Sequence, residues 1–195
     1  MKPFIFFLVC LALLFSCEPS ASSTNANSDG AVTTTNTAGF EVTALSEQLQ
    51  WLEKYDPDGN ILESGTLENG QRQGTWLYYG ATSKAPVKVE TYLDGQLHGA
   101  YFELDQMGRL KKSANYKMNQ LHGSYAEFRA GIPQITATYK DGQLDGTFRA
   151  HTLQNGKVNR TIEYKNGVQE GAMRWYNEQG ELMQERFYRN GEVVN

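Results

Sequence analysis

The chain has 195 residues, among them 19 glycines, 11 tyrosines and 9 phenylalanines, and it carries a formal net charge of −4. Glycine and tyrosine at this abundance favour strands and turns over helices, and the length suits one domain with accessory segments. Acidic and basic residues are interspersed, so the sequence lacks the clustered basic patch of a nucleic-acid-binding protein.

Residues 1–16 are interpreted as a signal peptide. Lys2 precedes an unbroken apolar run from Phe4 to Phe15. As a helix this run would rise about 18 Å, which is too short for a bilayer core of about 30 Å but typical of a signal peptide. The run ends in Leu14-Phe15-Ser16-Cys17, which resembles the lipobox of bacterial lipoproteins. The resemblance implies cleavage after residue 16 and a lipid on Cys17. An ordinary secretory signal, with Cys17 incidental, is the alternative.

Residues 17–40 are predicted to be a lipid anchor and a disordered tether. After Cys17 the segment consists almost wholly of Ser, Thr, Asn, Ala and Gly, which cannot bury enough apolar surface to fold. Cys10 and Cys17 are the only cysteines, so the rest of the chain has no disulfide framework. The residue after Cys17 is Glu18; in the lipoprotein resemblance this favours the outer membrane of a Gram-negative bacterium, and the membrane is then a partner through the lipid.

Residues 41–195 are predicted to form one repeat domain. A glycine that we call the anchor glycine recurs every 23–25 residues, at Gly74, Gly99, Gly123, Gly146 and Gly171. A tyrosine lies seven residues before the last four of these glycines, and the tyrosine series is Tyr92, Tyr116, Tyr139, Tyr164 and Tyr188. Two residues after each anchor glycine comes a large apolar residue, in the order Trp76, Tyr101, Tyr125, Phe148 and Met173. Such regularity indicates a repeat architecture.

Between tyrosine and anchor glycine lies a turn signal. The dipeptides are Asn69-Gly70, Asp94-Gly95, Met118-Asn119, Asp141-Gly142, Asn166-Gly167 and Asn190-Gly191. These residue types suit type I′ hairpin turns, in which both central residues have positive φ. Each repeat is therefore predicted to be two strands, and the chain about twelve strands in a long meander. The anchor glycine suits a bulge or a close backbone approach beneath an aromatic ring, and the rings on either side of the turn are expected to meet across the hairpin. Residues 43–52 are either a short capping helix or the first strand.

The pattern Tyr-x-x-Gly-x-x-x-Gly-x-aromatic resembles the MORN-repeat family, in particular its bacterial variant in secreted and lipid-anchored proteins, some of them labelled antitoxin-like. The resemblance covers residues 50–195 and recurs five times in register. It implies an all-β, elongated array of antiparallel β-hairpins, with about five full repeats and partial ends. It also implies roles in scaffolding and binding. A hairpin of this kind cannot bury its aromatic residues alone, so the copies must stack.

Two histidines occupy equivalent places in successive repeats. His98 and His122 precede their anchor glycines, where other repeats have Gln73, Asp145 and Glu170. Stacked repeats would align these residues as a polar ladder with metal-ligand chemistry. However, adjacent repeats lie about 10 Å apart, too far for both imidazoles to bind one ion. A solvent-facing polar position beside a turn is therefore the favoured interpretation, and no metal or cofactor is expected.

The aromatic column has two interpretations as well. The large residues after the anchor glycines form either the core of the array, which we favour, or a platform for glycan stacking. Trp175 and Tyr176, near the end of the chain, are the best candidates for an exposed binding pair. The final hairpin, from Arg189 onward, is predicted to leave an unpaired strand edge. That edge would either accept a partner strand or be blunted by the charges of Arg186, Arg189 and Glu192.

No catalytic motif is present in the sequence: it has no G-x-S-x-G, no H-E-x-x-H and no P-loop. We therefore expect a non-enzymatic cell-envelope lipoprotein whose repeats act as a protein-binding or spacing scaffold. A glycan- or peptidoglycan-binding module is the first alternative, and an antitoxin or immunity protein is the second.

The lipid anchor makes a first prediction. Replacing Cys17 by Ala removes the acylated thiol, so the protein should leave the membrane fraction and lose the mass of its acyl chains, since each buried CH₂ contributes about 0.8 kcal/mol to membrane binding. Membrane fractionation with intact-mass spectrometry measures both effects. A Cys10→Ala variant, altered inside the cleaved segment, should behave as the parent. A Cys17→Ala protein that keeps its mass and stays with the membrane would contradict the assignment.

Overall fold

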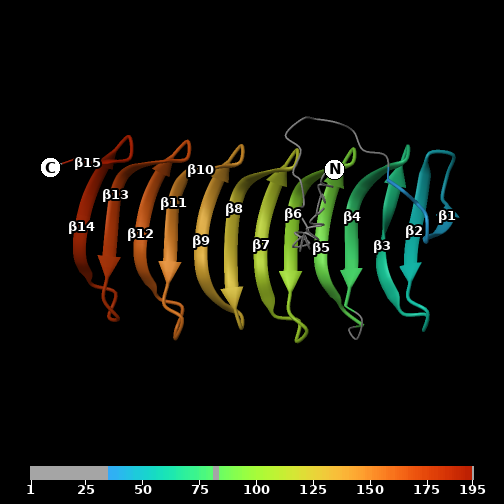
Figure 1. Ribbon diagram of the computed structural model, residues 1–195, viewed down its shortest axis with the longest axis horizontal. Helices are drawn as coiled ribbons and strands as arrows, with labels where there is room; N and C mark the ends of the chain where they lie inside the picture. Colours follow the sequence, from blue (N-terminus) through green and yellow to red (C-terminus); the bar gives the residue numbers. More distant parts are fainter. Residues whose placement is uncertain (1–34, 81–83, 195) are drawn as a thin grey trace, which may run out of the picture.

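The protein forms one open antiparallel sheet (Figure 1). The computed structural model describes residues 35–80 and 84–194, and in this part of the chain all regular structure is strand, in fifteen segments. Each strand pairs with the next one along the chain, except that the two-residue β10 pairs only with β9 beside β11. The prediction of an all-β array of hairpins is confirmed.

The strands are β1 (Glu41–Ala44), β2 (Leu49–Tyr55), β3 (Ile61–Glu68), β4 (Gln71–Tyr79), β5 (Pro86–Leu93), β6 (Gln96–Leu104), β7 (Leu110–Lys117), β8 (Gln120–Arg129), β9 (Ile132–Lys140), β10 (Gln143–Leu144), β11 (Gly146–His151), β12 (Val158–Lys165), β13 (Val168–Tyr176), β14 (Leu182–Arg189) and β15 (Glu192–Val194). The count exceeds the predicted twelve because short strands occur at both ends and at β10. For residues 43–52 the helix alternative is wrong: Thr43 of β1 pairs with Trp51 of β2.

The six predicted hairpin turns have the expected backbone. Both central residues have positive φ in every one, for example Asn69 at 50° and Gly70 at 76°. Met118 (49°) and Asn119 (65°) adopt the same conformation without glycine. A seventh turn of this kind, which the sequence analysis missed, joins β8 to β9 through Ala130 (φ 53°) and Gly131 (φ 81°). The type I′ prediction is therefore correct, including its glycine-free copy.

The anchor glycines lie opposite the tyrosines of the following strand. Gly74 pairs with Tyr92, Gly99 with Tyr116, Gly123 with Tyr139, Gly146 with Tyr164 and Gly171 with Tyr188. Their φ values lie between 65° and 114°, and the register shifts at this level in several hairpins, as between Glu90 and Tyr92. The predicted bulge is thus present, and it needs glycine because of the positive φ.

The rings do not pair as predicted. Tyr101 packs on Tyr116 at 5.5 Å between ring centroids, and Tyr125 packs on Tyr139 at 5.4 Å. In each case the aromatic residue after the anchor glycine contacts the tyrosine of the next hairpin, not the one before its own turn. The bulge shifts the register of the hairpin, so that Tyr92 faces Leu97 and Glu90 faces Tyr101. Aromatic packing therefore links successive repeats.

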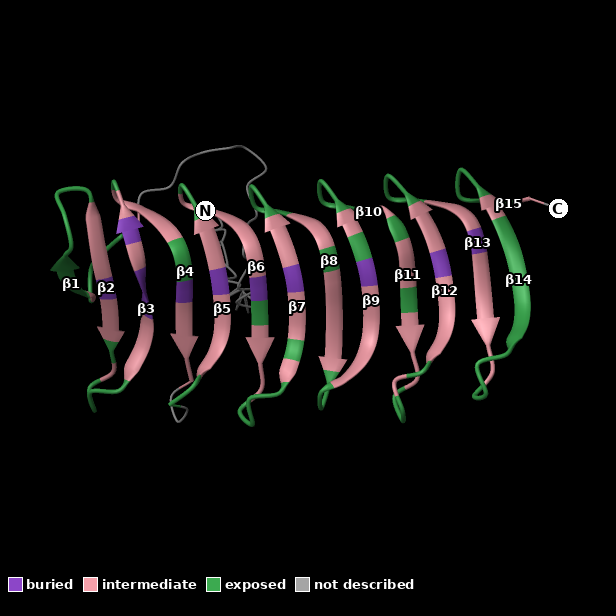
Figure 2. Ribbon diagram, turned by 180° about the vertical axis from the view of Figure 1, so that it is seen from behind, coloured by how far each residue is buried: buried purple, intermediate pink, exposed green. Residues whose placement is uncertain are grey.

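We call the side of the sheet that carries these rings the aromatic face, because alternate residues of each strand point to the same side. In two parts of its middle row, large side chains lie beside small ones on the neighbouring strands. Trp76 is fully buried, and a Cβ on Gly65 would lie 2.2 Å from its ring. Ala114, between Tyr101 and Tyr125, is only 1% exposed. The buried positions accordingly form a band across the middle of the strands (Figure 2).

The N-terminal end of the sheet is capped. Phe40 packs edge-on against Trp76 at 6.2 Å, and the backbone N–H of Thr35 donates to the carbonyl of Gly70 at 3.0 Å. Leu52, Leu67 and Trp76 form the largest buried apolar cluster, with Phe40 against it. Residues before β1 therefore cover the aromatic face where the array begins, as terminal repeats of such arrays require.

Gly65 gives a stability prediction. Gly65→Ala places a methyl group inside the Trp76 ring, so unfolding free energy should fall by about 3 kcal/mol, at the upper end of overpacking effects. Chemical denaturation measures it. In a Trp76→Leu background the same substitution should be milder, because the ring is gone. An equal effect in both backgrounds would show that the ring is not the cause.

Candidate functional site

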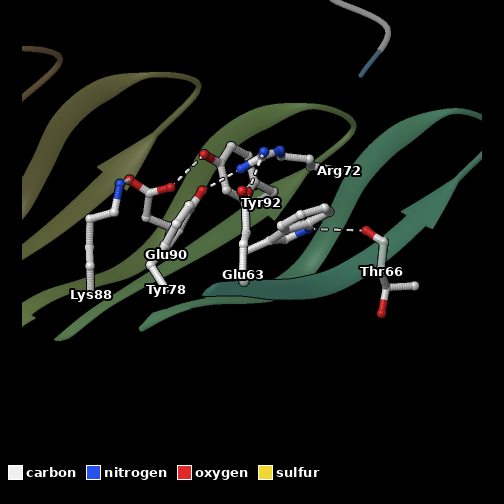
Figure 3. Close-up of polar contacts among 8 residues, drawn as sticks. Glu63, Thr66, Arg72, Tyr78, Lys88, Glu90 and Tyr92 are labelled. Atoms are coloured by element: carbon white, nitrogen blue, oxygen red, sulfur yellow. Dashed lines mark hydrogen bonds and ion pairs between the residues drawn. The ribbon is translucent and has the colours of Figure 1, made fainter. Parts of the chain in front are cut away.

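A charged and aromatic cluster lies on the aromatic face over β3, β4 and β5 (Figure 3). We call Glu63, Arg72, Trp76, Tyr78, Lys88, Glu90 and Tyr92 the Arg72 cluster. The Arg72 guanidinium lies 3.9 Å from the centroid of the Trp76 ring and donates to the Glu63 carboxylate at 2.6 Å. It also donates to the Tyr78 hydroxyl. Arg72 thus combines ring stacking with a directed ion pair.

Glu90 is the second centre of the Arg72 cluster. It is 7% exposed, accepts a hydrogen bond from the Tyr92 hydroxyl at 2.7 Å and pairs with Lys88 at 2.9 Å. Burial alone would raise the pKa of Glu90, but hydrogen bonds from Tyr78, Tyr92 and Lys88 outweigh burial and lower it. Burial, and then the Glu90 carboxylate, raise the pKa of Tyr92 to about 12. The pKa of Tyr78 is raised for the same two reasons.

The Arg72 cluster neutralises itself, because its two cations face its two carboxylates. Buried ion pairs of this kind are strongly destabilised when one partner is removed. Every charged group in the cluster has its partner within the cluster, so we assign the cluster to holding the first repeats together rather than to binding a ligand.

The same chemistry continues along the sheet in weaker form. The hydroxyls of Tyr101 and Tyr125 donate to Glu103 and Glu127, two residues further along their strands. Lys112 lies between them, with its Nζ 5.4 Å from each tyrosine ring. Lys112 faces Glu103 on one side and Glu127 on the other. Opposite charges directly across strands stabilise pairing modestly.

The polar ladder that contains the two histidines contacts the turns of the following hairpins. Gln73 accepts the backbone N–H of Asp94 at 2.9 Å, and Asp145 and Glu170 accept those of Asn166 and Asn190 at 3.0 and 2.7 Å. His122 accepts the N–H of Asp141 at 3.3 Å. These side chains therefore hold the first turn residue of the next hairpin, and they are only half-buried or more exposed.

His98 departs from this scheme. Its Nδ1 is buried and has no hydrogen-bond partner in the described chain. At this junction Asn119 supplies the contact instead, since its side-chain oxygen accepts the backbone N–H of Leu97 at 2.8 Å. Within residues 35–80 and 84–194, no three His, Cys, Asp or Glu residues lie close enough to hold a metal ion.

The aromatic column is core at its beginning and partly open at its end. Trp76 is fully buried and Tyr101 is 9% exposed, whereas Tyr125, Phe148 and Met173 are half-buried. Trp175 and Tyr176, the predicted binding pair, are half-buried and adjacent on β13, so they point to opposite faces of the sheet. They do not form one platform. The predicted lipidation site, Cys17, lies outside the described residues.

The last long strand of the sheet, β14, is largely exposed. Seven of the eight residues of β14 are exposed (Figure 2), including Met183 at 70% and Phe187 at 50%. On its outer side β15 pairs only with Phe187, Tyr188 and Arg189. Within the described chain, the outer edge of β14 from Leu182 to Arg186 therefore has no partner strand.

No protein-family model matches the chain, and no curated protein matches it. Among the described residues, no helix has the length and apolar character needed to cross a membrane.

The lowered pKa of Glu90 predicts a pH dependence. The ordinary pKa of a glutamate side chain is 4.5, and that of Glu90 is lower in the folded state. Its carboxylate therefore stabilises the folded state above pH 4.5, and this contribution is lost as the pH falls through the folded-state pKa. Glu90→Gln should therefore lower the free energy of unfolding most at neutral pH, with a difference from the parent that shrinks in acid. Urea titrations between pH 3 and 7 measure this. Glu47→Gln, in an exposed turn, is the control, and a difference for Glu90→Gln that does not vary with pH would contradict the assignment.

Proposed function

We propose that the protein is a non-enzymatic, lipid-anchored scaffold of the cell envelope. Its MORN-type array ends in a sheet edge that can accept a strand from a partner protein. The observation that carries the proposal is the free edge of β14, from Leu182 to Arg186, beside exposed apolar side chains. A partner segment in extended conformation would add a strand there, with backbone hydrogen bonds providing affinity and side-chain contacts providing selectivity.

The charges near this edge leave it open. Glu185 receives a 2.5 Å hydrogen bond from Arg174 on the neighbouring strand β13, and the Arg186 guanidinium lies 5.8 Å from the centroid of the Trp175 ring. Both side chains are thus engaged over the sheet rather than beyond it. Charges blunt an edge when they stand in the path of an incoming strand, and these two are held by β13.

The two ends of the array differ in how far the sheet is covered, and this difference favours a partner site at the C-terminal end. At the N-terminal end, Phe40 covers the aromatic face at Trp76, while β1 itself is exposed. At the other end Met183, Phe187 and Val193 remain exposed. An anchor at Cys17 would place the covered end towards the membrane and the open end away from it.

The scaffold proposal is tested by placing a charge on the edge. Met183→Lys puts an ammonium group beside the free edge of β14 and should abolish capture of a stoichiometric partner from detergent-solubilised envelopes. Met107→Lys is the matched control, because Met107 is 77% exposed in a turn away from the edge. Mass spectrometry of the captured material, with Cys17→Ala alongside, reads the result. Capture that survives Met183→Lys, or the absence of any stoichiometric partner of the parent protein, would refute the proposal.

A further inference from the structure

The face opposite the aromatic face, which we call the second face, changes character along the array. Its middle row can be followed strand by strand through the register. Over β4, β5 and β6 it consists of Leu77, Val89 and Phe102, each opposite the next. Over β11, β12 and β13 the same row consists of Arg149, Thr161 and Arg174. Equivalent positions in one array are thus apolar near the beginning and basic near the end.

These basic residues lie in a groove. We call the open groove of about 530 Å³ lined by Thr147, Arg149, Lys157, Thr161, Glu163, Arg174 and Tyr176 the Arg149 groove. It lies over β11, β12 and β13, between the loops at Lys157 and Gly180. Lys157 joins those two loops by donating to the backbone carbonyl of Glu178 at 3.0 Å. The groove contains three cations and one carboxylate, in a chain whose net charge is −4.

Two of the three cations are already engaged. Arg174 is held by Glu163 at 3.2 Å and by Glu185 at 2.5 Å, and Lys157 is bound to its carbonyl. The side chain of Arg149 is exposed, and it makes no ion pair or hydrogen bond within the described chain. Its strand neighbour Thr161 has a buried hydroxyl without a hydrogen-bond partner there. The Arg149 guanidinium is therefore free for a ligand, whereas the Thr161 hydroxyl, on the residue opposite it in the register, is covered.

The backbone around the groove is not free. Strands β11, β12 and β13 are interior to the sheet and pair with neighbours on both sides. A peptide that binds by adding a strand would find no free backbone partner on this floor. A ligand recognised here must bind through side chains alone, and it should carry its own dense set of polar groups.

We infer that the Arg149 groove binds an acidic saccharide, a sugar chain whose rings carry carboxylates. Arg149 presents the planar fork that matches a carboxylate. The Glu163 carboxylate can accept hydrogen bonds from ring hydroxyls, and Tyr176 supplies an aromatic surface at the end of the groove. This site is separate from the edge of β14 and does not rest on the scaffold proposal.

Calorimetric titration of the full chain in detergent micelles tests the inference. The probe is trigalacturonate at low salt, with neutral galactotriose and hexaglutamate as comparisons. Trigalacturonate should bind, galactotriose should not, and Arg149→Ala should weaken binding about tenfold or more, as expected for a hydrogen bond to a charged group. Arg129→Ala removes the same charge from an exposed site at the end of β8 and should leave binding unchanged.

A conservative variant guards against an indirect effect. Thr161→Val keeps the shape of the side chain and should leave binding unchanged, because the buried hydroxyl does not reach the ligand, with circular dichroism showing an intact sheet. Binding of hexaglutamate as tight as that of trigalacturonate would assign the groove to acidic peptides and overturn the saccharide. Equal losses for Arg149→Ala and Arg129→Ala, or no binding of any probe, would overturn the site itself.

Discussion

In the described chain the sheet has no second layer to pack against, and this constraint shapes nearly every other feature. A single sheet can bury apolar side chains only by laying them along its own face, each over its neighbour. Large rings therefore alternate with small residues across the strands, as Trp76 does with Gly65 and as Tyr101 and Tyr125 do with Ala114. The glycine opposite each tyrosine supplies the bulge that sets this interlocking register. Burial depends on the neighbouring repeat, so stability is shared along the array.

Polar contacts, like the apolar ones, join each repeat to the next. Four of the hairpin turns, those that begin at Asp94, Asp141, Asn166 and Asn190, are each held by the preceding repeat twice. The backbone N–H of the second turn residue donates to a carbonyl there, as Gly95 does to Arg72 at 2.9 Å. A side chain before the anchor glycine accepts the N–H of the first turn residue, as Gln73 does for Asp94. Side chains as different as glutamine, aspartate, glutamate and histidine serve equally, because each offers an acceptor at the same height. This explains why sequence varies at a position that geometry keeps constant.

The hairpin turns were the part of the structure that could be predicted from the sequence. Asn-Gly and Asp-Gly dipeptides give the hairpin turns directly, because few other residues accept positive φ at both places. The turn at Ala130-Gly131 escaped, since alanine does not signal such a backbone. Side-chain partners were harder to predict from the sequence. The bulge at Glu90 and Tyr92 shifts the register of the hairpin. The tyrosine rings therefore meet across a different pair of strands from the one that counting residues from the turn suggests. The Arg72 cluster and the Arg149 groove join residues from three strands each, and no single segment of sequence contains their pattern.

The order of the strands also determines how the molecule would respond to tension. Strands β1 and β15 lie at opposite ends of the sheet (Figure 1), so a pull between the ends acts across the strands and not along them. Hydrogen bonds loaded in this direction break one after another, so one hairpin can detach from the sheet while the neighbouring hairpins stay paired. One released repeat of about 24 residues would yield roughly 80 Å of extended chain. We therefore expect the array to lengthen under tension by releasing single repeats, rather than to resist tension as one rigid unit.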